Sequence, residues 1–217
     1  MKRVLTLIMI AAVIGLLVWQ NPFEVEVASP WKKWQLLCAS LEAPNMSAAD
    51  AAALIDKYDI DVNTIEGPAA PIQFAVYSGD VEKVRMLISR GASVQVGTSG
   101  PYSLPVIAII DNNIPVLKEL LAGGCDIECG NFSQGFTLLM CAVQENRPAM
   151  AEWLLQNGAQ VNYRSVQVYP EEERNFTALH VAAWGKNRAM YDLLVRYGAD
   201  ESLRDEKGKT AKYYLAP

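Results

Sequence analysis

The chain has 217 residues, 51% of them apolar, and a formal net charge of −5 from 24 acidic and 19 basic side chains. This length accommodates one sizeable core or one array of repeats. The acidic balance argues against a nucleic-acid partner, since nucleic-acid binding requires basic residues clustered on one face.

The amino terminus carries Lys2 and Arg3, followed by an apolar segment from Val4 to Trp19. Basic residues before such a segment are typical of a signal peptide or of a short membrane anchor. The segment is shorter than the roughly 20 helical residues that span a bilayer, which favours a signal peptide. A good cleavage site is hard to find, however, because Glu26 stands where cleavage after Ala28 requires a small residue.

Together these observations favour an uncleaved anchor helix at residues 1–20 over a removed signal peptide. In either case Lys2 and Arg3 stay on the cytoplasmic side, because positive residues are retained there, and the rest of the chain is exported. We therefore expect a periplasmic location in a bacterium, with the chain tethered to the inner membrane. The alternative is a buried amino-terminal helix of a cytosolic protein.

Two helices are predicted next, after a spacer at residues 21–29. Pro30 suits the first position of a helix, with Ser29 as its N-cap. The second helix follows the capping pattern of Ser47 to Asp50 and runs to Tyr58.

From residue 64 onward the sequence repeats itself. A small residue recurs as Ala75, Ala108, Ala142 and Ala182, and a glycine recurs as Gly91, Gly124, Gly158 and Gly198. Both series advance by 33, 34 and then 40 residues, so two independent markers keep one register. Each glycine fits a helix that ends in a left-handed residue. A unit this short cannot bury its own apolar face and needs neighbours.

The repeated unit has a signature. Residues 177–182 read TALHVA, and the corresponding segments are APIQFA at 70–75, SLPVIA at 103–108 and TLLMCA at 137–142. This pattern resembles the ankyrin repeat, whose period is about 33 residues with a T-P-L-H-x-A signature.

The resemblance implies an all-α ankyrin-repeat solenoid of helix–turn–helix units with β-hairpin loops, preceded by the hydrophobic signal or anchor helix. Four repeats would occupy residues 64–202. Residues 30–63 would form a degenerate amino-terminal capping repeat and residues 203–217 a truncated carboxy-terminal one, since the end repeats of such arrays are atypical.

The step of 40 places about seven extra residues between the third and fourth repeats. They fall in residues 163–174, which contain Tyr169, Glu171, Glu172, Glu173 and Arg174. Insertions in repeat arrays map to loops, often on the binding face, and an aromatic residue beside charged ones suits a protein contact. The alternative is a tolerated surface insertion, because longer loops cost little closure entropy.

Few residues are suited to chemistry. His180 is the single histidine, and its place in the signature implies a structural hydrogen bond in the turn. Cys38, Cys125, Cys129 and Cys141 lack the ligand set and spacing of a metal site. A disulfide among the last three stays open in an exported chain. The sequence therefore predicts no catalytic residue, no metal site, no cofactor and no enzymatic activity.

By resemblance, ankyrin proteins bind partners through their hairpin tips and the exposed side of their first helices. Together with the insertion, the matching residues here are Tyr77, Tyr102, Ile110, Asp111, Phe136, Gln144, Glu145, Phe176 and Trp184. Aromatic residues are enriched at the energetic centres of interfaces. Phe136 and Phe176 have an alternative role, which is packing against the adjacent hairpin. Trp184 is the leading candidate anchor, because a large ring at a solvent-facing helix site has no evident core to fill.

A small exported ankyrin array without chemistry of its own resembles an inhibitor or chaperone of another exported protein. Its layout is similar to that of the Tli family of ankyrin-type immunity proteins, which neutralise phospholipase effectors of type VI secretion. This resemblance implies that the array binds a secreted phospholipase and occludes its substrate entrance. The alternative is a periplasmic ankyrin scaffold or chaperone that supports another exported enzyme. Neither reading calls for nucleic acid or a small-molecule substrate.

Overall fold

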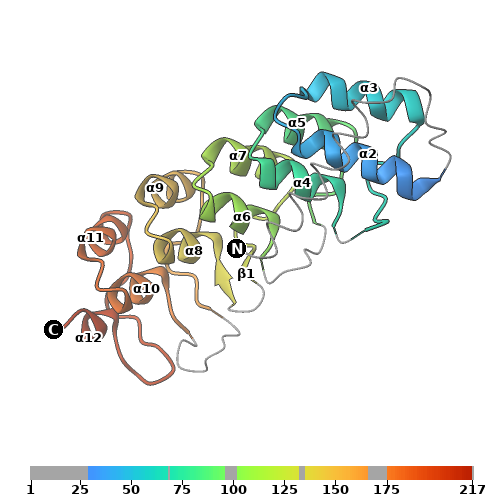
Figure 1. Cartoon of the computed structure of the whole chain (residues 1–217). Helices are drawn as coiled ribbons and strands as arrows, with labels where there is room; N and C mark the ends of the chain where they lie inside the picture. Colours follow the sequence, from blue (N-terminus) through green and yellow to red (C-terminus); the bar gives the residue numbers. More distant parts are fainter. Residues whose placement is uncertain (1–28, 68, 96–101, 132–134, 166–174, 217) are drawn as a thin grey trace. The chain divides into compact units, whose positions relative to one another are not determined.

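The computed structural model describes residues 29–67, 69–95, 102–131, 135–165 and 175–216. The chain forms two compact units, one ending at Ser99 and the other beginning at Gly100. Paired helices recur along each of them (Figure 1). No helix in the described ranges is long and apolar enough to cross a bilayer. The predicted signal or anchor at residues 1–20 lies outside these ranges.

The described part of the first unit consists of two helix pairs. They are α2 (Pro30–Glu42) with α3 (Ala48–Tyr58), and α4 (Pro71–Ser78) with α5 (Val81–Ser89). The pairs stack, with α2 against α4 and α3 against α5. Helix α2 begins with the predicted Ser29 cap, and α3 begins with the predicted capping box, so both expected helix starts are confirmed.

Helix α2 is fixed in this unit by two side chains. The indole Nε1 of Trp34 donates to the backbone oxygen of Ala69 at 3.2 Å. Lys83, on α5, is 1% exposed, and its Nζ donates to the backbone oxygens of Leu41 at 3.0 Å and Ala43 at 2.8 Å. A cation suits this place, because the carbonyl groups at the end of a helix have no intrahelical partner and carry partial negative charge.

The described part of the second unit consists of three helix pairs, a last short helix and a two-stranded hairpin. The pairs are α6 (Leu104–Ile110) with α7 (Ile114–Ala122), α8 (Leu138–Gln144) with α9 (Pro148–Gln156), and α10 (Ala178–Trp184) with α11 (Arg188–Arg196). The last helix, α12 (Ala211–Leu215), packs against α10. The first helices of the pairs therefore stack in the order α6, α8, α10 and α12 (Figure 1).

The hairpin of the second unit is short. Strands β1 (Gly130–Asn131) and β2 (Phe136–Thr137) are antiparallel, with Gly130 opposite Thr137. Within the described ranges, further β pairing is limited to the isolated bridge between Arg204 and Thr210. Within the parts of the predicted hairpin loops that the structure describes, strand character is therefore small.

Every repeat buries its first helix in the same register. Six consecutive residues are buried at 71–76, 104–109, 138–143 and 178–183, and exposure increases directly after each run. The closing glycines at 91, 124, 158 and 198 all have left-handed backbone, with φ from +84° to +101°. Both features follow the repeat register that the sequence predicts, and the glycine prediction is confirmed.

Consecutive repeats are joined by the same asparagine contact in both units. The Nδ2 of Asn63 donates to the backbone oxygen of Gly91 at 2.9 Å, and its Oδ1 accepts from the backbone N–H of Ser93 at 2.8 Å. Asn162 bonds in the same way to Gly198, at 3.2 Å, and to the residue two positions later, at 2.8 Å. The left-handed turn of one repeat is thereby held against the end of the preceding repeat.

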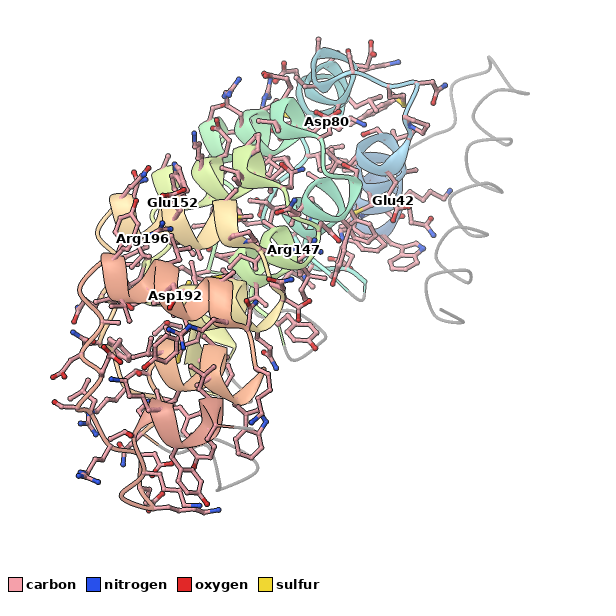
Figure 2. All side chains as sticks on the ribbon, turned by 90° about the vertical axis from the view of Figure 1, so that its left-hand side faces the viewer. Glu42, Asp80, Arg147, Glu152, Asp192 and Arg196 are labelled. Atoms are coloured by element: carbon pink, nitrogen blue, oxygen red, sulfur yellow. The ribbon has the colours of Figure 1, made fainter. Side chains whose placement is uncertain are left out.

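The second helices expose charged side chains. Figure 2 shows Glu152 on α9, with Asp192 and Arg196 on α11. Tyr197 connects these two helices by donating its hydroxyl proton to Glu152 Oε1 at 3.0 Å. The ends of the first helices of the second unit carry a mixture of side chains, with the carboxylates of Asp111 and Glu145, the amide of Gln144 and the ring of Trp184.

Candidate protein-binding surface

The residues that follow the buried run of each first helix form the candidate surface. Those that are exposed are Tyr77 in the first unit and Asp111, Gln144, Glu145 and Trp184 in the second. Ile110 is half-buried. Exposure makes these side chains available to a partner, and their role in binding stays a prediction.

Other residues predicted for this surface differ in their exposure. Tyr102 is 40% exposed, but Phe136 and Phe176 are only 4% and 1% exposed. The two phenylalanine rings therefore offer little area to a partner, and the structure favours the packing role that the sequence left as an alternative. The insertion residues Tyr169, Glu171, Glu172, Glu173 and Arg174 lie outside the described ranges.

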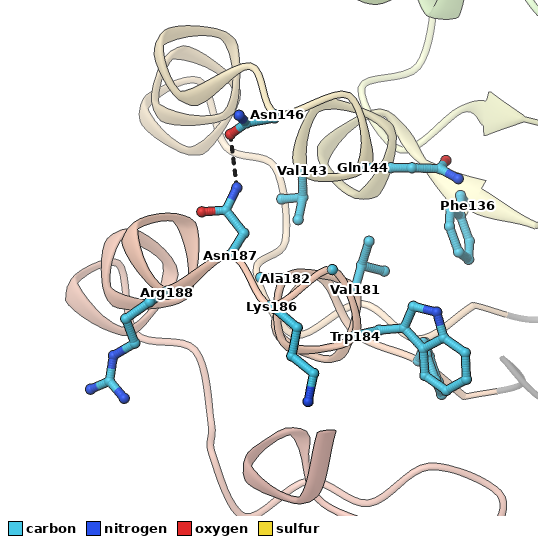
Figure 3. A pocket seen from close by; sticks show the side chains of 12 residues that line it. Phe136, Val143, Gln144, Asn146, Val181, Ala182, Trp184, Lys186, Asn187 and Arg188 are labelled. Atoms are coloured by element: carbon cyan, nitrogen blue, oxygen red, sulfur yellow. Dashed lines mark hydrogen bonds between the residues drawn. The ribbon is translucent and has the colours of Figure 1, made fainter. Parts of the chain in front are cut away.

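A groove hollows this surface between α8 and α10 (Figure 3). Its volume is about 520 Å³. Figure 3 shows Phe136, Gln144, Val181 and Trp184 around the space. Val143 and Ala182 add further apolar lining, and the rest of the wall is polar, formed by Gln144, Asn146, Lys186, Asn187 and Arg188.

The ring of Trp184 packs against two other aromatic rings, which its position at the exposed end of α10 did not suggest. Its ring is 49% exposed, with a centroid 6.0 Å from that of Phe176 and 5.1 Å from that of Tyr214. Tyr214 is held in turn by its hydroxyl, which donates to Asp205 Oδ2 at 2.5 Å. The expectation that Trp184 has no core to fill is therefore wrong, because one side of its ring supports the packing of α12. The other side remains available to a partner.

Both cations at the groove already have partners. The Nζ of Lys186 donates to the backbone oxygen of Tyr214 at 2.8 Å and to that of Ala216. The Nε of Arg188 donates to Asp192 Oδ1 at 3.0 Å. These contacts reduce the positive charge that the groove presents to an incoming group.

The polar rim of the groove consists of amides. Gln144, Asn146 and Asn187 are exposed or half-buried. Asn187 donates through Nδ2 to Asn146 Oδ1 at 2.8 Å, as the dashed line in Figure 3 shows. Amides offer donors and acceptors without charge, so this rim is suited to the backbone of another protein.

His180 is a structural residue. Its side chain is 1% exposed, Nδ1 accepts from the backbone N–H of Thr177 at 3.3 Å, and Nε2 donates to the backbone oxygen of Lys209 at 3.2 Å. These partners require the neutral ring with its proton on Nε2. Burial lowers the pKa of His180, more than its hydrogen bond to Lys209 raises it.

Gln73 takes the same part in the first unit. Its Oε1 accepts from the backbone N–H of Ala70 at 2.6 Å, three residues before it, as His180 does with Thr177. His180 is the single histidine of the chain, and Gln73 substitutes for it in the first unit, which was not predicted. Its signal was present in the sequence, since glutamine also offers an acceptor at the signature position.

Comparison with known proteins settles the family. Family models match in two places: ankyrin repeats in three copies over residues 94–165, and a further ankyrin repeat over residues 174–206. The chain is an ankyrin repeat protein. The helix pairs α2 with α3 and α4 with α5 precede the matched residues, and the repeat boundaries drawn there remain predictions from the sequence.

Relatives of this ankyrin protein include alpha-latrotoxin-Lg1a from Latrodectus geometricus. The two are 31% identical over 153 residues, which is 70% of this chain and 11% of the toxin. The chain spans a third or less of the length of the first curated relatives that it matches.

Two solved structures share the ankyrin fold. One is a chain from the structure of the predatory endopeptidase Bd0816 from Bdellovibrio bacteriovorus in complex with the immunity protein Bd3460. It is 26% identical to this chain with a TM-score of 0.65, and the match covers 83% of this chain and 89% of that one. The other is the human ASB11 ankyrin repeat domain, with 24% identity, a TM-score of 0.66 and coverage of 96% and 88%.

Cys38, Cys125, Cys129 and Cys141 of this ankyrin protein all lie in the described ranges and form no disulfide there. Burial raises the pKa of Cys125 to about 11 and that of Cys129 to about 12, so the reactive thiolate is scarce at neutral pH. Within the described ranges, no group of three or more histidine, cysteine, aspartate or glutamate side chains is placed to hold a metal ion. The surface is thus suited to binding a protein through shape, apolar contact and amide hydrogen bonds.

Proposed function

We propose that this ankyrin protein is an immunity-type inhibitor, which binds an exported hydrolase effector and occludes its substrate entrance. The observation that carries the proposal is the 26% identity over 83% of the chain to a chain from an endopeptidase–immunity complex. Ankyrin repeats are in general protein-interaction modules rather than catalysts. Occlusion suits such a module, because it requires a surface and no reactive group.

The second unit supports this proposal through its geometry. Exposed side chains follow the buried run of three stacked first helices, at Asp111, Gln144 and Trp184, and a groove of about 520 Å³ opens between two of these helices. Interfaces of this kind concentrate their binding energy in a few aromatic anchors within a well-packed centre. Trp184 has the exposure and the rigid support for that part.

Two classes of hydrolase are candidates for the partner. The resemblance to ankyrin-type immunity proteins favours a phospholipase effector of type VI secretion. The solved complex favours an endopeptidase, since that is the enzyme of the similar structure. We place the phospholipase first because the layout of a hydrophobic amino terminus followed by an array matches that family. The net charge of −5 would speed encounter with a basic enzyme surface more than it would raise affinity.

The location follows from the amino terminus. We propose that residues 1–20 hold the array at the outer face of the bacterial inner membrane, where an effector delivered to the periplasm would meet it. A chain lacking residues 1–20 is expected to keep binding the hydrolase in vitro and to lose protection in the periplasm. Loss of binding in vitro would show that these residues belong to the folded array.

The proposal is tested with candidate hydrolases, beginning with any that a neighbouring gene encodes, each purified and mixed with the full-length protein. Release of fatty acid from phospholipid vesicles reports a phospholipase, and cleavage of a peptide substrate reports an endopeptidase. We expect activity to fall to background at a molar ratio of about one to one, as a tight interface of standard size allows. Binding without any loss of activity would replace the proposal with the scaffold or chaperone function.

A further inference from the structure

Gly185 is an exception among the four repeats. The residues at the equivalent position of the preceding repeats are Ser78, Asp111 and Glu145. The backbone of Gly185 has φ −72° and ψ 4°, which any L-amino acid adopts. Glycine is therefore not required here by the conformation of the chain.

Steric crowding does not require glycine at position 185 either. A Cβ atom at Gly185 would lie 3.5 Å from the backbone oxygen of Val181 and 3.8 Å from that of Ala182, which is ordinary van der Waals contact. The first atom of a side chain would fit without displacing its neighbours. Its absence leaves open the groove in which Gly185 lies beside Trp184.

We call the groove lined by Phe136, Val143, Val181, Trp184 and Gly185 the Gly185 pocket. Figure 3 shows Phe136 and Trp184 on one side of it, with Val143 and Val181 between α8 and α10. Its volume of about 520 Å³ exceeds that of one side chain and lies within the range of functional pockets. The pocket can therefore hold one large apolar side chain with part of the loop that carries it.

The charge of the pocket decides what kind of side chain it suits. Its cations, Lys186 and Arg188, are engaged by backbone oxygens of the last helix and by Asp192. No carboxylate occurs among the described residues that line it. A cationic anchor would meet Lys186 and Arg188 and no carboxylate in the described lining. An acidic anchor would compete with Asp192 for Arg188 and with the backbone oxygens of Tyr214 and Ala216 for Lys186. An uncharged anchor avoids both of these conflicts.

We propose that the Gly185 pocket receives an aliphatic or aromatic side chain from an uncharged loop of the partner, at the place where the preceding repeats carry a side chain of their own. The amides of Gln144, Asn146 and Asn187 bond to the backbone of that loop. The identity of the partner as a hydrolase rests on the function proposed above. The chemistry of the pocket does not, because it follows from its lining alone.

The test uses small probes and the full-length chain in lipid nanodiscs. The chain is labelled with 5-fluorotryptophan, and the fluorine resonance of Trp184 is assigned by its loss in Trp184→Phe. N-acetyl-phenylalaninamide and N-acetyl-leucinamide should shift this resonance saturably at millimolar concentration. N-acetyl-glutamic acid amide and N-acetyl-lysinamide should bind at least about tenfold more weakly. Equal responses to charged and uncharged probes would overturn the proposal.

Gly185→Gln and Glu152→Gln form a pair of variants. Both introduce glutamine at an exposed helix position of the second unit, but Glu152 lies on α9 and does not line the pocket. We expect the Kd of N-acetyl-phenylalaninamide to rise at least about tenfold in Gly185→Gln and less than about twofold in Glu152→Gln. An unchanged Kd in Gly185→Gln, or an equal loss in both variants, contradicts the proposal. Gly185→Ala, the smaller substitution, provides an intermediate loss if Gly185→Gln unfolds.

The hydrolase then separates this inference from the proposed function, since the probe experiment requires no enzyme. If the chain inhibits no hydrolase, the proposed inhibitor function is wrong, and the binding of the small probes still tests which side chains the pocket accepts. If Gly185→Gln inhibits as well as the unsubstituted chain, the function stands and the pocket is not part of the interface. The expected result is at least about tenfold weaker inhibition by Gly185→Gln and unchanged inhibition by Glu152→Gln.

Discussion

The first and last described helices, α2 in the first unit and α12 in the second, are held in different ways. Helix α2 has 13 residues and buries Trp34, Leu37, Cys38, Ser40 and Leu41. Helix α12 has five residues and buries only Ala211. A lysine donates to two backbone oxygens at the end of each helix, but Lys83 is 1% exposed whereas Lys186 is exposed.

The same contact, a lysine ammonium group that donates to two backbone oxygens, therefore occurs at the end of a buried helix and at the end of an exposed one. In the first unit it lies within a core, where an unbonded carbonyl would be costly and each hydrogen bond is strengthened by low polarity. In the second unit it lies in water, beside the surface ion pair of Lys212 with Glu201 at 2.7 Å. Such exposed contacts contribute little. We therefore expect α12 to open more readily than α2.

The repeats themselves show that both lysines are departures from a pattern. Lys83 replaces the apolar residues found at the equivalent positions, which are Val116, Met150 and Met190. Lys186 replaces Gly79, Asn112 and Asn146, and all four have positive φ. Lysine adopts this left-handed conformation less readily than glycine or asparagine. At both positions the residue type that the other repeats favour is replaced by a lysine, which donates to the end of α2 or of α12.

The largest expected effect is a difference in stability loss between Trp34→Ala, at α2, and Trp184→Ala, beside α12. Trp34→Ala should lower the free energy of unfolding by about 3–5 kcal/mol, because it removes a buried ring and its hydrogen bond to Ala69. Trp184→Ala should lower it by about 1–2 kcal/mol, since the ring is half exposed. Chemical denaturation measures both values. Equal losses would remove the distinction between a buried and a surface-held end.

The stability loss of Trp184→Ala also affects how a binding experiment is interpreted. Weaker partner binding by this variant has two sources, the lost contact and the loosened α12. Tyr214→Phe is the control, because it retains the ring and removes only the hydrogen bond to Asp205. An anchor role predicts that Trp184→Ala weakens binding by more than about 1 kcal/mol and that Tyr214→Phe leaves it unchanged.

The lysines provide the next comparison. Lys83→Met introduces the residue of two equivalent positions but leaves the oxygens of Leu41 and Ala43 without their donor. It should lower the free energy of unfolding by about 2 kcal/mol. Lys186→Asn should change it by less than about 0.5 kcal/mol, because a lost surface contact is offset by a better left-handed residue. Urea titration checks both, and a stabilised Lys83→Met would contradict the role assigned to its hydrogen bonds.

The closing glycines should show no difference between the units. Gly91 in the first unit and Gly198 in the second have φ of +84° and +87°. Replacement of either by alanine should cost about 1 kcal/mol, because alanine is strained in this conformation. Gly185→Ala should instead be neutral or stabilise by about 0.5 kcal/mol, since its backbone is ordinary. Thermal unfolding of the three variants compares them directly.

The smallest expected effect concerns pH. Burial lowers the pKa of His180 below its ordinary 6.5, so the unfolded chain binds a proton more readily than the folded one. The stability that this residue contributes is present above pH 6.5 and is lost as the pH falls through the folded pKa. The first unit has Gln73 at the equivalent position, which does not titrate.

His180→Gln tests that difference between the units. The variant should differ from the unsubstituted chain by less than about 1 kcal/mol at pH 8, because glutamine retains the acceptor for Thr177. The difference in free energy of unfolding between the unsubstituted chain and His180→Gln should become smaller as the pH falls below 6.5. Hydrogen exchange of α10, followed from pH 8 to pH 5, measures the effect, and a gap that is constant with pH would exclude it.

Local pattern predicted much of the fold. The repeat register, the left-handed glycines and the helix starts at Ser29 and Ser47 depend on residues within a few positions of one another. The exposed ends of the first helices follow from the same register. What the sequence did not reveal depends on residues far apart in the chain, such as the contact of Lys83 with Leu41 or the packing of Tyr214 on Trp184.

The candidate surface shows the same division. Its positions were predicted by counting from the signature, but the burial of Phe136 and Phe176 required knowledge of the neighbouring hairpin and last helix. The Gly185 pocket was visible in the sequence as a missing side chain. That it is a hollow lined by aromatic rings became evident when α8 and α10 were seen side by side.

The sequence by itself therefore determined the repeat, its register and the places where a partner has access, because backbone geometry and the period of apolar residues are local properties. Only the tertiary structure decided which exposed-looking rings are packed, which lysine is buried and where the surface is hollow. Those outcomes depend on which side chains of successive repeats meet, and that is set by the stacking of helices rather than by any one of them.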